Sequence, residues 1–90
     1  MNNARRKEIK RISAELADLQ TSLEDLKDEL DALKDEESDY YDNMPEGIQS
    51  GEKGDKAQEA IDNLSEAVSA MEEAAENMTS AVDYMESATE

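Results

Sequence analysis

The feature that most constrains this chain is a heptad repeat in its first half. Apolar residues recur there at alternating steps of three and four: Ile9, Ile12, Leu16, Leu19, Leu23, Leu26, Leu30 and Leu33. With Ile9 at heptad position a, these residues alternate between a and d, and Tyr40 takes the next d position. Such a stripe predicts an amphipathic helix that pairs with another helix. We expect this helix to span about residues 3–42.

Two rows make up the stripe. The a row contains Ile9, Leu16, Leu23 and Leu30, and the d row contains Ile12, Leu19, Leu26, Leu33 and Tyr40. Charged residues flank both rows, with Glu8, Glu15 and Glu29 at g and Lys27 and Lys34 at e. Charges at these positions are typical of a helix–helix seam. We expect one neighbouring helix to cover both rows.

The second half repeats the pattern with different residues. Positions a hold Ile61, Val68, Ala75 and Val82, and positions d hold Leu64, Met71, Met78 and Met85. A third row, here called the alanine row, occupies the g positions: Ala60, Ala67, Ala74, Ala81 and Ala88. An apolar face three positions wide is typical of a helix inside a bundle. We expect a second helix over about residues 52–88, with a face broad enough for two neighbours.

A break separates the two repeats, at about residues 43–51. It contains Pro45, which disfavours helical geometry at Met44, and the first two of the three glycines. Ser50 is the expected N-cap of the second helix. Two helices of similar length joined by a short turn form an antiparallel hairpin. The sequence therefore predicts an all-α single domain over residues 1–90, an antiparallel two-helix coiled coil.

The small size of the chain favours self-association. Ninety residues bury only a modest core, and without cysteine the chain has no disulfide to supplement it. Burial of the broad face of the second helix would add stability. We therefore expect two hairpins to dimerise into a four-helix bundle. The interface candidates are Ala60, Ala67, Ala74, Ala81, Met71 and Met78.

The residue inventory argues against catalysis. The chain has no histidine, the commonest general base, and no cysteine nucleophile. The acidic stretch 35–42 lacks the ligand order of a calcium loop, and residues 51–54 lack the spacing of a phosphate-binding loop. We expect neither an enzyme nor a protein that holds a metal or cofactor.

The formal net charge of −16 limits the partners. It disfavours nucleic acid and anionic membranes, and it suits a basic protein, such as one that normally binds nucleic acid. Acidity that serves only solubility is the alternative. No apolar run approaches the roughly 18 residues of a membrane span, and no signal peptide is apparent. We expect a cytoplasmic protein.

A basic cluster at the N-terminus stands out against this acidity. It contains Arg5, Arg6, Lys7, Lys10 and Arg11. In an antiparallel hairpin these cations would pair with Asp83, Glu86 and Glu90 at the other end of the chain. Alternatively they would bind phosphate, in particular if oligomerisation gathers several clusters at one end.

Exposed aromatic and methionine side chains are common in interfaces. Tyr40, Tyr41, Met44 and Ile48 gather at the turn, where they would form an apolar cap or a recognition tip. Tyr84 falls at c, outside the apolar face, and is a further contact candidate.

A short block around the turn carries a resemblance, and it reads Tyr40-Tyr41-Asp42-Asn43-Met44-Pro45-Glu46. With the opening stretch 3–7 and the two acidic helices, it resembles small proteins encoded by phages and prophages of Gram-positive bacteria. The resemblance implies a phage origin and a site of action inside a bacterial cell. It carries over no catalytic or binding residues.

Three functions follow, in order of preference. The first is an interaction protein that binds and modulates or inhibits a host protein, as a DNA mimic or an anti-defence factor; small acidic phage proteins offer the analogy. The second is a structural or assembly coiled-coil factor. The third is an oligomeric nucleotide sponge that uses the basic cluster.

Overall fold

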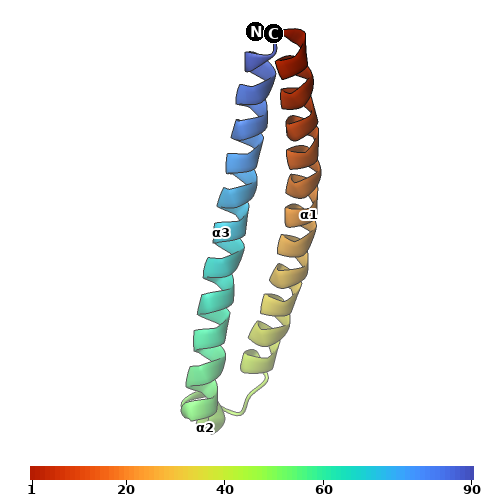
Figure 1. Ribbon diagram of the computed structural model, residues 1–90. Helices are drawn as coiled ribbons and strands as arrows, with labels where there is room; N and C mark the ends of the chain where they lie inside the picture. The colour runs from red at the N-terminus through yellow and green to blue at the C-terminus, as the bar shows by residue number, and fades with distance from the viewer. The chain divides into compact units, whose positions relative to one another are not determined.

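The computed structural model describes residues 1–90 and contains three helices and no strand (Figure 1). They are α1 (Asn3–Asp42), α2 (Glu46–Gln49) and α3 (Glu52–Ala88). The prediction of an all-helical chain is confirmed. The four-residue helix α2 lies inside the stretch that was expected to be only a turn.

The chain divides into two compact units. The first unit combines Met1–Asp25 with Met71–Glu90, and the second unit is the continuous stretch Leu26–Ala70. Each unit therefore contains one segment of α1 and one segment of α3, and α2 belongs to the second unit.

The two helical segments of the first unit run antiparallel. The side-chain amide of Gln20 donates a hydrogen bond to the hydroxyl of Thr79. Ile9, eleven residues before Gln20, lines a concavity with Thr89, which is ten residues after Thr79 and directly follows α3. The two segments therefore lie side by side with opposite chain directions. The two chain ends lie close together at one end of this unit (Figure 1).

In the second unit, α2 contacts both the last turn of α1 and the first turn of α3. The backbone N–H groups of Ile48 and Gln49 both bond the carbonyl of Pro45, at 2.9 Å each. The side-chain amide of Gln49 donates to the carbonyl of Tyr41 at 2.8 Å, which ties α2 to the last turn of α1. Gly54 is buried, and a Cβ at this position would overlap the backbone of Gln49. The absence of a side chain there lets α2 lie directly on the first turn of α3.

Ser50 does not cap α3, so the expected N-cap assignment is wrong. Its hydroxyl donates to the carbonyl of Glu46 at 3.1 Å, and its N–H bonds the same carbonyl. Ser50 therefore closes α2, because serine hydroxyls readily bond carbonyls three or four residues earlier. α3 begins directly after Gly51, whose carbonyl accepts a hydrogen bond from the N–H of Asp55.

The buried residues all lie on α3: Gly54, Ala57, Val68 and Ala75. No residue of α1 is fully buried, although its a row is half-buried in both units. The d row is exposed, from 45% at Ile12 to 57% at Leu19. The prediction that one neighbour covers both rows is therefore wrong for the d row.

A rotation of α1 about its own axis explains the exposure of the d row. The e positions of α1 are half-buried beside the a row: Ser13 and Gln20 in the first unit, Lys27 and Lys34 in the second. The aliphatic stem of a lysine can cover apolar surface while its ammonium stays in water. α1 thus turns its a and e positions inward, and the d row turns outward.

Candidate interaction surface

The d row gives each unit an exposed apolar strip. Ile12 and Leu19 form it in the first unit, and Leu26, Leu33 and Tyr40 form it in the second. Single exposed apolar residues are ordinary on protein surfaces, but a row of large ones at heptad spacing is typical of a helix-pairing face. Exposed carboxylates flank it at the g positions: Glu8, Glu15, Glu29 and Glu36.

In the first unit, the alanine row lies on the same side as the d row. Gln20 and Thr79 both occupy e positions, and their hydrogen bond shows that the e positions of the two helices share one side. In an antiparallel pair the g positions then share the opposite side. That is the side toward which α1 turns its d row. Ile12 and Leu19 accordingly lie on one side of the first unit with Ala74, Ala81 and Ala88.

The second unit contains the same two kinds of residue: Ala60 and Ala67 are half-buried, and Leu26, Leu33 and Tyr40 are exposed. The interface candidates Ala60, Ala67, Ala74, Ala81, Met71 and Met78 are all half-buried within the chain, and Ala88 is exposed. The first unit thus offers a surface made of large apolar side chains from α1 and small ones from α3. The role of the d row was missed at the sequence level because the heptad pattern does not distinguish an inward row from an outward one.

The positions of α3 next to the alanine row carry no charge. These are the c positions, and all four are exposed: Asn63, Ala70, Asn77 and Tyr84. Tyr84 is 78% exposed, the most of any large apolar residue in the chain. In a chain of which 38% is charged, an uncharged exposed strip is notable, because charged residues are depleted at the centres of interfaces.

The carboxylates of α3 lie elsewhere on its surface. Eight of them are exposed and form no ion pair: Asp55, Glu59, Asp62, Glu66, Glu73, Glu76, Asp83 and Glu86. No lysine or arginine follows Lys56 in the sequence, so α3 has no cation of its own beyond its first turns. This surface attracts cations from outside the chain.

The basic cluster does not pair with the end of α3, so the expected ion pairs with Asp83, Glu86 and Glu90 are wrong. Arg11 instead binds Glu8 at 3.1 Å and Glu15 at 3.2 Å within α1. The hydrogen bond and charge of Glu8, with the charge of Glu15, raise the pKa of Arg11. Arg6 donates to the side chain of Asn3.

Arg5, Lys7 and Lys10 form no ion pair at all. None of the three reaches the carboxylates at the end of α3. Lys7 and Lys10 line an open concavity with Arg6, Asn3 and Ala4. Of the cations that the sequence suggested for phosphate binding, Arg5, Lys7 and Lys10 are thus free to meet an anion.

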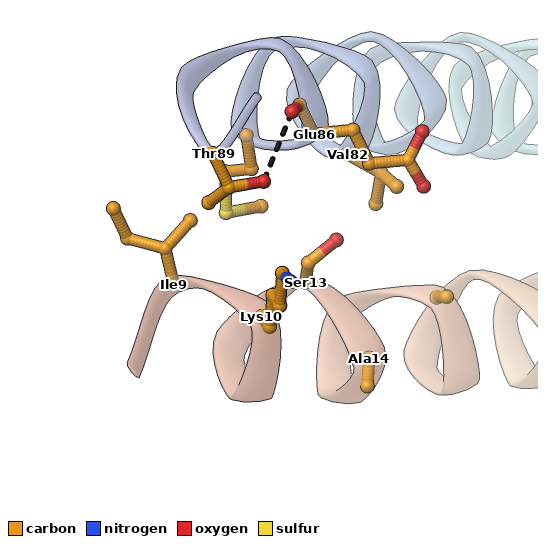
Figure 2. Close-up of a pocket in the computed structure, with 9 residues that line it drawn as sticks. Ile9, Lys10, Ser13, Ala14, Val82, Glu86 and Thr89 are labelled. Atoms are coloured by element: carbon orange, nitrogen blue, oxygen red, sulfur yellow. Dashed lines mark hydrogen bonds between the residues drawn. The ribbon is translucent and has the colours of Figure 1, made fainter. Parts of the chain in front are cut away.

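A small concavity of about 360 Å³ lies between the two helical segments of the first unit (Figure 2). Ile9, Val82 and Met85 contribute its apolar wall, and Lys10 and Glu86 both line it without forming an ion pair. Thr89 donates to the backbone carbonyl of Glu86 at 3.0 Å, the dashed line in Figure 2. Ser13 and Ala14 of α1 both line the concavity, and the side chain of Ser13 points toward α3 (Figure 2).

The residues predicted to gather at the turn separate into two kinds. Tyr41 and Met44 are half-buried, and the Tyr41 carbonyl accepts the bond from Gln49. Tyr40 and Ile48 are exposed. Tyr40 therefore belongs with the d row rather than with a closed apolar cap.

None of the three helices combines the length and apolar character that a membrane span requires. No group of three or more carboxylates is placed so that it could hold a metal ion. No protein-family model, curated protein or solved structure matches the chain.

Proposed function

We propose that this chain is a non-catalytic, acidic interaction protein that binds a basic protein and modulates its activity. The observation that supports this most directly is the set of eight exposed, unpaired carboxylates on α3. Their mutual repulsion destabilises the folded chain, and a partner rich in lysine and arginine would relieve it. Complementary charge also speeds association and rejects acidic competitors.

A protein that normally binds nucleic acid is the partner class that fits best. Its cationic groove is built for a closely spaced series of negative charges, about one per 1.7 Å in duplex DNA. The resemblance to phage and prophage proteins adds a biological setting, the cytoplasm of a bacterial host. There, an acidic helical protein that occupies such a groove would inhibit a host or defence enzyme.

Affinity capture from a bacterial lysate at low salt tests this function. The variant Glu66→Gln, Glu73→Gln, Glu76→Gln, Asp83→Asn removes four unpaired carboxylates of α3. The matched control Glu8→Gln, Glu15→Gln, Asp31→Asn, Glu52→Gln removes four that already bind a cation within the chain. We expect the native chain and the control to retain the same basic protein and the α3 variant to lose it. Equal retention by both variants, or capture of no basic protein, would contradict the proposal.

An assembly factor is the second candidate, and the exposed d row favours it. In this function two hairpins form a four-helix bundle whose purpose is to join other proteins. Substitution Leu19→Ser, Leu33→Ser would then abolish function while the α3 carboxylate variant kept it.

Anion binding is the third candidate, favoured by the unpaired state of Arg5, Lys7 and Lys10. Calorimetry with a panel of nucleotides tests it directly. Heat of binding that disappears in the variant Lys7→Gln, Lys10→Gln would support it, and no heat with any nucleotide would exclude it.

A further inference from the structure

We infer that the d row of each chain packs on the alanine row of a second copy. This inference rests on the self-association proposed above. It does not depend on binding to a basic protein, because the α3 carboxylates lie outside the d row and the alanine row. In the resulting dimer each α1 lies between its own α3 and the partner's α3, antiparallel to both. That is the cyclic order of a four-helix bundle with two-fold symmetry.

The two rows match in size and spacing. Five large side chains recur every seven residues on α1, and five alanines recur every seven residues on α3. In the first unit, one antiparallel register places Ile12 against the partner's Ala88 and Leu19 against the partner's Ala81. A large side chain fills the space that a small one leaves, which is how well-packed layers form.

The second unit matches in the same register. Leu33 lies against the partner's Ala67, and Tyr40 lies against the partner's Ala60. This register also agrees with the one inside the chain, where Gln20 bonds Thr79. The register that places Leu19 opposite the partner's Ala81 is shifted by only one residue from the register that pairs Gln20 with Thr79 inside the chain. One α1 can therefore contact both copies of α3 at the same level.

The charges on this side permit a second copy. The α3 carboxylates occupy other positions of the helix, and the c positions beside the alanine row are uncharged. The same register places the carboxylate of Glu15 opposite the partner's Tyr84 in the first unit. In the second unit it places Glu36 opposite the partner's Asn63. A tyrosine hydroxyl and an asparagine amide both donate hydrogen bonds, so the acidic edge of α1 meets neutral donors.

Alternative arrangements of two copies bring like charges together. Pairing of α3 with a second α3 through its outer surface would oppose the unpaired carboxylates of both chains. Pairing of α1 with a second α1 along the d row would bring the Glu15 and Glu36 edges of both copies into the same contact. The pairing of the d row with the alanine row avoids both. It also covers Tyr84, which is 78% exposed in the single chain.

Disulfide trapping between two single-cysteine variants tests this arrangement, because the native chain has no cysteine. Leu19→Cys and Ala81→Cys are purified separately, mixed and oxidised with the full chain otherwise unchanged. We expect a covalent dimer in the mixture and little in either variant alone. The matched control replaces Ala81→Cys with Ser80→Cys, one residue away and on a different side of α3.

The mass of the native chain at tens of micromolar completes the test. Sedimentation equilibrium should give twice the chain mass of 10.0 kDa. A monomer mass would overturn the inference, as would equal trapping by Ser80→Cys. Efficient trapping of Leu19→Cys with itself would show that two α1 helices pair instead. Both measurements use the purified chain, so failure here leaves binding to a basic protein to be decided by lysate capture.

Discussion

The side chains of Gln20 and Thr79 join α1 to α3 through a hydrogen bond in the first unit. The Thr79 hydroxyl in turn donates a hydrogen bond to the carbonyl of Ala75 at 3.2 Å, so the three groups form a short chain. Because both residues occupy e positions, this bond places the e positions of the two helices on one side. It thereby leaves the d row of α1 and the alanine row of α3 on the other.

Removal of the Thr79 hydroxyl should lower stability. Thr79→Val keeps the shape of the side chain but leaves the Gln20 amide without its acceptor on α3. We expect the free energy of unfolding to fall by about 1 kcal/mol. The control Thr21→Val removes a hydroxyl that bonds only the carbonyl of Ala17 within α1, at 3.3 Å. Chemical denaturation that shows equal losses for the two variants would mean that the interhelical bond contributes nothing.

The two rows of α1 should respond differently to truncation. Leu23 of the a row is half-buried, whereas Leu26 of the d row is 55% exposed. In dilute solution, where the chain is monomeric, Leu23→Ala should cost about 2 kcal/mol and Leu26→Ala less than about 1 kcal/mol. The cost of Leu26→Ala should grow with protein concentration, because the dimer buries it. Urea unfolding at several concentrations measures both effects, and a larger loss for Leu26 in dilute solution would contradict the orientation of α1.

Charge placed on the alanine row should dissociate the dimer. The variant Ala67→Glu, Ala81→Glu puts one carboxylate into the interface in each unit. The control Ser69→Glu, Ser80→Glu adds the same charge at exposed positions on other sides of α3. We expect light scattering to give a monomer mass for the first variant and a dimer mass for the control, with helical circular dichroism in both. An unchanged mass for the first variant would place the interface elsewhere.

Two glycines near the turn should have opposite responses to alanine. At Gly54 a Cβ would overlap the backbone of Gln49, so Gly54→Ala should displace α2 and lower the melting temperature. At Gly47, inside α2, a Cβ meets nothing within 4 Å, so Gly47→Ala should raise stability by up to about 1 kcal/mol. Thermal unfolding followed by circular dichroism measures both. Equal responses would show that α2 does not lie on α3 as described.

Salt should stabilise the folded chain. With a net charge of −16, repulsion among carboxylates outweighs the few ion pairs, and added ions screen it. The melting temperature should therefore rise between low and moderate ionic strength. A flat or falling response would indicate that attractive pairs, such as Arg11 with Glu8 and Glu15, dominate.

Local pattern was sufficient for the helical class. The unbroken steps of three and four from Ile9 to Leu33 are a property of neighbouring residues, and only a helix places all of them on one face. The charge of α3 and the absence of histidine and cysteine are likewise readable without coordinates. They limit the chemistry available to the chain, whatever its tertiary structure.

Which side of each helix faces its neighbour was decided only by the tertiary structure. The a row and the d row are equally apolar, so the sequence of α1 alone allows either to turn inward. The choice depended on residues about sixty positions away, because Gln20 meets Thr79 when the e positions turn toward α3. Ser50 and the basic cluster follow the same rule. Ser50 was expected to cap α3 but bonds Glu46 of α2, and Arg11 was expected to pair with the end of α3 but binds Glu8 and Glu15 of its own helix.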